Sequence, residues 1–174
     1  MLTYIKQWSY NKKLKERKST IRLDQKAPVN HGSKISILYE LEKLENHTIV
    51  HKFKERLVNQ GRRVKTLSYI DQKIDVGTFS QKAFSKKEVN WDGVPQSPYV
   101  EEFIEWDADI LMCPILEMRS GYNYIINSSP ARFKIGLNCE EAEELFDLII
   151  DIPPSTNLNQ RLDAILNQLK ILSH

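Results

Sequence analysis

The sequence predicts a three-layer α/β sandwich with a mostly parallel, Rossmann-like sheet, preceded by a basic helical arm. Short apolar runs alternate along the chain with longer segments of helical period, which favours strand–helix–strand units. Runs such as Ile110 to Leu116 are apolar on both faces, as buried parallel strands are. The charge is uneven, because residues 1–34 hold nine Lys/Arg against two Asp/Glu, whereas residues 35–174 hold 16 Lys/Arg against 21 Asp/Glu.

Residues 1–29 are expected to form the basic arm. Its first half spaces apolar side chains three residues apart and then turns strongly basic, which predicts a helix over residues 1–18. Residues 19–33 keep no sustained period and contain a proline and a glycine, so a linker is expected there. The apolar positions of the predicted helix are Leu2, Ile5 and Trp8.

The α/β domain, residues 30–174, is expected to begin with a strand–helix–strand unit. The first strand is "KISILYE", residues 34–40, and the second is "RVKTLSYI", residues 63–70. Between them Asn46 is expected to cap a helix with one apolar face, and Gly61 is expected to end it. A crossover of this length predicts a parallel strand pair.

The second half of the domain continues the alternation. Residues 71–90 are polar and carry no clear period, and then Ser97 with Pro98 predicts the start of a helix that runs to Trp106. A short segment "GYNYIINSS" and an acidic loop "NCEEAEE" separate the later strands. The strands expected here cover residues 109–116, 131–137 and 146–152, and the last helix covers residues 157–172.

Composition excludes several classes of protein. A chain of 174 residues fits one domain whose core needs neither metal nor disulfide. The longest apolar runs are strand-sized, well short of the roughly 18–20 residues of a membrane helix, and the first residues lack the pattern of a secretory signal. Cys113 and Cys139 form neither a disulfide framework nor a zinc motif, so a cytoplasmic protein is expected.

No cofactor, metal or catalytic residue is predicted. The segment after the first strand, "LEKLENHT", lacks glycine, and neither a dinucleotide fingerprint nor a P-loop occurs in the chain. His47, His51 and Glu55 share one helical face at a spacing suited to a metal, but no fourth ligand is visible, and a solvated helix face with His47 near the cap is expected instead. Ser128 and Ser129 lack the motif of an activated nucleophile.

The basic arm gives the strongest functional indication. Dense positive charge suits a phosphate backbone, and the interleaved Tyr4, Trp8 and Tyr10 can stack on unpaired bases. This pattern predicts a non-enzymatic RNA-binding or ribosome-associated protein. Alternatively, Leu2, Ile5 and Trp8 form the apolar face of a helix that lies on an anionic membrane or on a protein partner. The residues assigned to nucleic acid are Lys12, Lys13, Lys15, Arg17, Lys18, Arg22, Arg62 and Arg63.

A second class of function is a nucleotide-sugar or small-molecule transferase, which would use the loops at the carboxyl ends of the strands. Asp71 and Asp151 stand at such ends, and Asn90, Trp91 and Asp92 belong to the turn "NWDGVP". Trp91 can stack on a base or a sugar. Turn chemistry explains the same residues without any ligand, because Asp-Gly is a common turn dipeptide.

Six segments of the chain resemble an uncharacterised family of short bacterial α/β proteins. They are "SILYELEK", "GRRVKTLSYID", "VNWDGVP", "ADILMCPI", "ARFKIGL" and "ELFDLIIDI". The likeness covers roughly residues 30–172 and is most specific at Asn90 to Pro95, which matches an "NWxGxP"-like turn. The resemblance implies an α/β fold and no particular activity.

Overall fold

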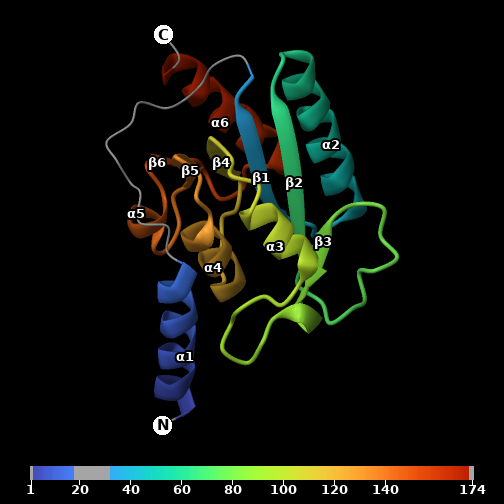
Figure 1. Ribbon diagram of the computed structural model, residues 1–174. Helices are drawn as coiled ribbons and strands as arrows, with labels where there is room; N and C mark the ends of the chain where they lie inside the picture. Colours follow the sequence, from blue (N-terminus) through green and yellow to red (C-terminus); the bar gives the residue numbers. More distant parts are fainter. Residues whose placement is uncertain (1, 18–31, 173–174) are drawn as a thin grey trace.

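A computed structural model describes residues 2–17 and 32–172 and contains a six-stranded, all-parallel sheet (Figure 1). The strands are β1 (Lys34–Glu40), β2 (Arg63–Ile70), β3 (Ala83–Ser85), β4 (Ile110–Cys113), β5 (Phe133–Leu137) and β6 (Leu148–Ile150). Their order across the sheet is β3-β2-β1-β4-β5-β6. The chain therefore builds one half of the sheet outward from β1, returns to β4 and builds the other half, as in doubly wound folds.

Helices cover both faces of the sheet. They are α1 (Leu2–Arg17), α2 (Leu44–Asn59), α3 (Pro98–Ile104), α4 (Ser120–Ser128), α5 (Ala142–Leu145) and α6 (Leu158–Leu172), with a 3₁₀ turn η1 (Lys86–Glu88). Helices α2 and α6 pack on one face, and α3, α4 and α5 pack on the other (Figure 1). The predicted three-layer α/β fold with an N-terminal helix is confirmed.

Strand β1 shows why the central strands are apolar on both sides. Ile35, Ile37 and Tyr39 belong to the core beneath α2 and α6, whereas Leu38 belongs to the core beneath α3 and α4. Successive side chains of a strand point to opposite faces, so a strand covered on both faces needs apolar residues almost throughout. The bounds predicted for β1 and β2 are confirmed to the residue.

The predicted cap of α2 is wrong. The helix begins at Leu44, and its cap residue Lys43 makes no capping hydrogen bond through its side chain. Asn46 lies inside the first turn, where its Nδ2 donates to the backbone oxygen of Glu40 at 3.3 Å and ties the helix start to the end of β1. The predicted stop is confirmed, because the helix ends just before Gly61, which has a φ of +80° that favours glycine.

Several short elements differ from the predictions. Strand β4 ends at Cys113, three residues early, and Pro114, which lacks an N–H for the sheet, follows it. Helix α3 begins at Pro98 after the cap residue Ser97, as expected, although the Ser97 hydroxyl makes no capping bond, and it ends at Ile104. Strand β3 and helix α5 occupy segments for which no regular element was expected, and helix α4 occupies the short segment "GYNYIINSS", to which no element was assigned.

Two aspartates join neighbouring strands at the amino edge of the sheet, where the parallel strands begin. Asp109 Oδ2 accepts a hydrogen bond from the Lys34 backbone N at 2.8 Å, and Asp147 Oδ2 accepts one from the Lys134 backbone N at 2.7 Å. These side chains stabilise the strand starts. The opposite, carboxyl edge is the one where ligands bind in open parallel sheets.

Candidate functional site

The reversal of strand order places a crevice at the carboxyl ends of β1 and β4, because the chain leaves these two neighbouring strands toward opposite faces of the sheet. A cavity of about 460 Å³ lies there. Its walls come from the segments that follow β1 and β4 and from the start of α6. The lining includes Glu40, Ile115, Leu116, Glu117, Arg119 and Leu158.

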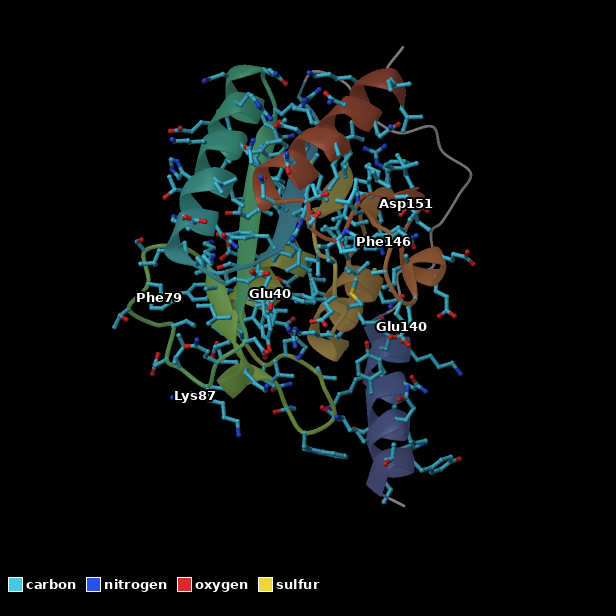
Figure 2. The ribbon with its side chains drawn as sticks, turned by 180° about the vertical axis from the view of Figure 1, so that it is seen from behind. Glu40, Phe79, Lys87, Glu140, Phe146 and Asp151 are labelled. Carbon is cyan, nitrogen blue, oxygen red and sulfur yellow. The ribbon has the colours of Figure 1, made fainter. Side chains whose placement is uncertain are left out.

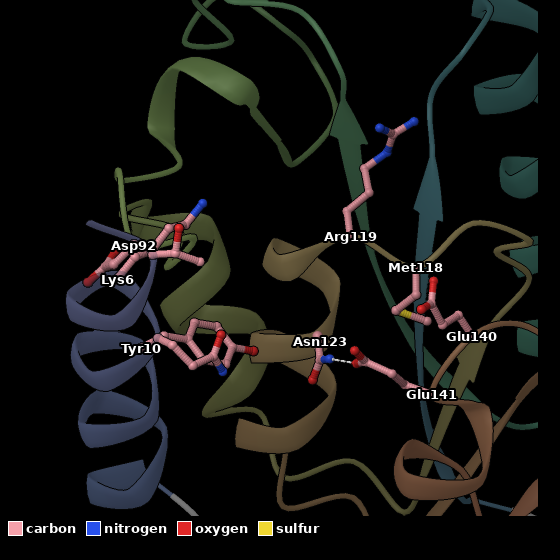
Figure 3. A pocket seen from close by; sticks show the side chains of 10 residues that line it. Lys6, Tyr10, Asp92, Met118, Arg119, Asn123, Glu140 and Glu141 are labelled. Carbon is pink, nitrogen blue, oxygen red and sulfur yellow. Dashed lines mark hydrogen bonds between the residues drawn. The ribbon is translucent and has the colours of Figure 1, made fainter. Parts of the chain in front are cut away.

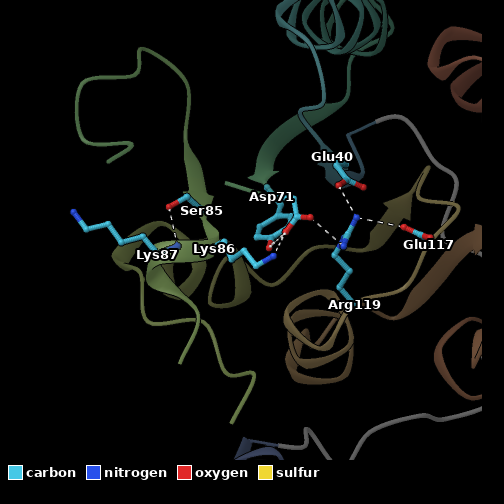
Figure 4. Close-up of polar contacts among 8 residues, drawn as sticks. Glu40, Asp71, Ser85, Lys86, Lys87, Glu117 and Arg119 are labelled. Carbon is cyan, nitrogen blue, oxygen red and sulfur yellow. Dashed lines mark hydrogen bonds and ion pairs between the residues drawn. The ribbon is translucent and has the colours of Figure 1, made fainter. Parts of the chain in front are cut away.

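Arg119 is the centre of the polar contacts at this edge (Figure 4). Its Nη2 lies 3.3 Å from Glu40 Oε1 and 3.3 Å from Glu117 Oε2, and its Nη1 lies 3.2 Å from Asp71 Oδ2. Asp71 also accepts a hydrogen bond from the Tyr69 hydroxyl at 3.0 Å. One guanidinium therefore links the end of β1, the end of β2 and the segment after β4.

The carboxylates of this cluster titrate differently. Burial raises the pKa of Glu40 above its ordinary value, and the charge of Arg119 offsets this only in part. Burial also acts to raise the pKa of Asp71, but hydrogen bonds from Tyr69 and Lys86 and the charge of Arg119 hold it below its ordinary value. The cluster is short of positive charge around Glu40, because Glu40 and Glu117 share the Arg119 guanidinium with Asp71, and among the described residues only Asp71 has a second cation, Lys86 at 3.3 Å.

Two buried polar atoms at this edge have no hydrogen-bond partner within the described part of the chain. They are Arg119 Nε and the hydroxyl of Tyr122, a residue that is only 1% exposed. Both residues line a cavity of about 40 Å³ together with Tyr69 and Gly121. Burial raises the pKa of Tyr122 well above its ordinary value, and so does the nearby carboxylate of Glu40. The hydroxyl therefore stays protonated and able to donate.

Helix α1 lies over the carboxyl edge, beside α4 (Figures 1 and 3). Tyr10 packs edge to face against Tyr124 of α4, with ring centroids 6.0 Å apart. A cavity of about 310 Å³ remains between the helix and the edge, lined by Lys6 and Tyr10 on one side and by Arg119 and Glu141 on the other. The arm thus forms one wall of the carboxyl edge.

The turn Asn90 to Pro95 is the anchor of α1. Asp92, which is 1% exposed, accepts hydrogen bonds from Ser9 Oγ at 2.8 Å and from Lys13 Nζ at 2.7 Å. Burial acts to raise the pKa of Asp92, but the bonds from Lys13 and Ser9 hold it below its ordinary value. Asn90 closes the turn through backbone bonds to Val94 and Gly93, and Trp91 is exposed.

The remaining side chains predicted for nucleic acid fall into three groups. Lys12 and Lys15 are exposed on α1, and Lys12 Nζ lies 5.6 Å from the centre of the Trp8 ring. Arg17 ends the helix, whereas Lys18 and Arg22 lie outside the described residues. Arg62 and Arg63 stand at the start of β2, at the opposite edge of the sheet from α1, where they line a cavity of about 820 Å³. The structure does not bring these two arginines to the arm.

Asp151 and the histidine face of α2 lie apart from the Arg119 cluster. Asp151, after β6, accepts a hydrogen bond from Asn138 Nδ2 at 3.3 Å and is well separated from Glu40 in Figure 2. His47 Nδ1 lies 3.2 Å from the Tyr39 hydroxyl, and His51 Nδ1 lies 3.7 Å from Glu55 Oε1. Among residues 2–17 and 32–172 there is no group of three or more His, Cys, Asp or Glu side chains that could hold a metal ion.

Within the same ranges no helix combines the length and the apolar character that a membrane crossing requires.

Sequence reasoning named Asp71 but missed Arg119, Glu40, Glu117 and Tyr122. One signal was available, because Arg119 is the only basic residue between Lys87 and Arg132. A lone arginine shortly after a buried strand is a candidate partner for carboxylates at neighbouring strand ends. The carboxylates themselves were not identifiable until the strand order was known.

The chain belongs to a family of unknown function, DUF6913, whose family model matches residues 3–172. This confirms the expected membership of an uncharacterised family and extends it over α1, which the resemblance at residues 30–172 did not include. Neither a curated protein nor a solved structure matches the chain significantly.

Proposed function

We propose that this protein binds single-stranded RNA, in a ribosome-associated role and without catalysis of its own, through the outer face of α1. The observation that carries the proposal is the exposure of two aromatic side chains among lysines on a helix that is anchored to the domain. Tyr4 is 78% exposed and Trp8 is 60% exposed. The outer face of α1 consists of Tyr4, Ile5, Trp8, Lys12 and Lys15.

The spacing of these residues separates them from the anchored side of the helix. At 100° per residue, the five positions of the outer face fall within about 100° of one another. Ser9, Tyr10, Lys13 and Leu14 point the other way and make the contacts with the domain. The outer face is consequently free of the packing that would explain its aromatic side chains.

The chemistry of the outer face suits a nucleic acid better than a purely apolar partner. Bases stack on exposed aromatic rings, typically with about 1–3 kcal/mol per base, and lysines neutralise the phosphates between them. Lys13 is committed to Asp92, so Lys12 and Lys15 are the lysines of the outer face that can contact phosphate. The anchor at Asp92 also keeps the helix ordered before RNA binds, which lowers the entropic cost of binding.

Fluorescence anisotropy with a labelled 12-nucleotide oligouridylate tests the proposal. We expect binding that weakens as salt rises, with a log–log slope of about −0.7 for each phosphate contact. Trp8→Ala is expected to weaken binding by about 1–3 kcal/mol through lost stacking, and Lys12→Ala to flatten the salt slope by about one contact. The matched controls on α2 are the exposed Leu44→Ala and Lys52→Ala, which should bind as the unaltered protein does.

Sucrose-gradient sedimentation of cell lysate tests the ribosomal role. Point variants of the outer face are preferable to deletion of α1, since deletion would also uncover Asp92 and Tyr124. We expect migration with ribosomal particles at low salt that is lost at high salt and lost with Trp8→Ala. Sedimentation at the top of the gradient under all conditions would refute the ribosomal role. Binding to anionic liposomes in place of RNA would refute the proposal in favour of a membrane surface.

A further inference from the structure

We propose that the carboxyl edge of the sheet is a second site, at which the Arg119 Nε–H and the Tyr122 hydroxyl donate hydrogen bonds to a neutral, polyhydroxylated small molecule. The chemical class is a vicinal diol of a sugar, present either as a free sugar or as the ribose of a nucleoside. The site is independent of the outer face of α1.

The two unpartnered atoms define what the ligand must offer. The Nε of an arginine only donates, and a protonated phenol donates as well as accepts, so the group missing between them is an acceptor oxygen. Both atoms are buried, which makes their lack of an acceptor costly. The 40 Å³ cavity that Arg119 and Tyr122 line exceeds the ~10–15 Å³ that one oxygen-sized group needs.

The surrounding charge indicates that the oxygen is neutral. Glu40, Asp71 and Glu117 surround the guanidinium, and only Asp71 has a second cation among the described residues, Lys86 at 3.3 Å. The charged residues that line the larger cavity are Glu40, Glu42 and Glu117 against Arg119 and Arg161, so a phosphate or carboxylate ligand would meet an excess of negative charge. A hydroxyl group avoids this repulsion, because it can accept from Arg119 or Tyr122 and donate to a carboxylate. Several adjacent hydroxyls would satisfy both kinds of partner at once.

The neighbouring cavity has the size and lining for the rest of such a molecule. Its volume of about 460 Å³ falls in the ~300–1,000 Å³ range of small-molecule sites. Glu40 and Glu117 supply acceptors on one side, and Ile115 and Leu158 supply apolar contacts for the carbon skeleton. Arg119 lines both this cavity and the smaller one, so the two cavities border the same side chain, and the proposal places one ligand across both.

The strand order indicates the same site, and the turn after β1 is unsuited to a diphosphate ligand. The site lies where strand order reverses, the position at which doubly wound sheets bind ligands. Helix α4 begins directly after Arg119, and the first N–H groups of a helix have no acceptor within it, which again favours an oxygen. The turn after β1 has no glycine to admit a pyrophosphate, so the diol is the part of a ligand that this edge can recognise.

Thermal melting with D-ribose, D-glucose, adenosine and 2′,3′-dideoxyadenosine tests the inference. We expect a saturable rise in melting temperature with at least one of the first three and none with the dideoxynucleoside, because ligand that binds only the folded state stabilises it. A response to a free sugar identifies that source, whereas a response to adenosine alone identifies a nucleoside. No response to any diol, or an equal response to adenosine and its dideoxy analogue, overturns the proposal.

Substitution of the donors localises the response. Tyr122→Phe removes the hydroxyl and keeps the ring, and it is expected to weaken the affinity for the responding diol at least tenfold. Tyr39→Phe is the matched control, since that hydroxyl is equally buried but bonds to His47, and it should leave the affinity unchanged. An unchanged affinity with Tyr122→Phe overturns the proposal and leaves the small cavity to an ordered water. Trp8→Ala should alter RNA binding only, which keeps the two proposals separable.

Discussion

The Tyr122 hydroxyl gives the sharpest prediction about stability. Tyr122 and Tyr39 are each 1% exposed and lie on opposite faces of the sheet. The Tyr39 hydroxyl lies 3.2 Å from His47 Nδ1, whereas the Tyr122 hydroxyl has no partner among the described residues. Replacing each tyrosine with phenylalanine removes one oxygen from an equally buried ring, so the two variants differ mainly in the hydrogen bond that is lost.

The expected changes have opposite signs. A buried hydroxyl without a partner costs about 1–3 kcal/mol of desolvation, so Tyr122→Phe is expected to raise the free energy of unfolding by up to that amount. Tyr39→Phe loses a hydrogen bond worth about 0.5–1.5 kcal/mol and leaves a ring nitrogen of His47 unpaired. For a chain of 174 residues, each kcal/mol corresponds to roughly 2–4 °C in melting temperature.

Urea denaturation followed by circular dichroism measures both variants without added ligand. A shift of the midpoint at constant slope reports a change in stability alone. If Tyr122→Phe destabilised the protein as much as Tyr39→Phe does, the Tyr122 hydroxyl would already have a good partner. The reasoning from a missing acceptor would then be refuted.

Three further predictions concern α1 and the core. Asp92→Asn should weaken the attachment of α1 by about 1–3 kcal/mol. This is less than the roughly 3–5 kcal/mol of a broken buried pair, because the Lys13 side chain is 38% exposed. Faster amide exchange across α1 in the variant measures the weakened attachment. The pKa of Asp92 is lower in the folded state than in the unfolded state, where it is about 3.9. The ionised Asp92 therefore stabilises the docked helix fully above the unfolded-state pKa, and this stabilisation is lost as the pH falls through the folded-state pKa. The protection factors of the α1 amides, which compare the observed exchange with the intrinsic rate at the same pH, should therefore fall in acid. Protection factors that do not change with pH would contradict the role of Asp92. Gly136→Ala should destabilise the fold by about 1–3 kcal/mol, because the new Cβ would clash with the Phe146 ring. Thermal melting measures the lost stability, and adding Phe146→Leu to this variant should recover part of it.

The sequence predicted the elements whose own residues carry a strong signal. Strands β1 and β2 are long apolar runs between turn residues, and their bounds were predicted correctly. Strand β3 has only three residues, and Ser85 is held there by a bond to the backbone oxygen of Ile74 at 2.6 Å. No periodicity can be read from three residues, so contacts with the rest of the fold decide this strand.

The candidate site depended on information that lies in the strand order. Asp71 was identified because it follows a predicted strand directly. Arg119 and Tyr122 become important only because β4 lies next to β1, which brings Glu40 to the guanidinium across 79 residues of sequence. Pairing between strands this distant in sequence leaves no local pattern. The same holds for Asp92, whose role as an anchor depends on a helix 79 residues away.

The docking of α1 also has a consequence for the order of events during synthesis. Ser9 and its acceptor Asp92 are separated by 83 positions, which a ribosome at ~5–20 residues per second covers in roughly 4 to 17 s. A helix of 16 residues is only marginally stable alone in water, so throughout this delay it samples unfolded conformations. Tyr10 and Leu14, which later face the domain, are then as accessible to chaperones and to the ribosomal surface as Trp8 is. Helix α1 is synthesised before Asp92 and Tyr124, and it can dock on the domain only after both residues have been synthesised.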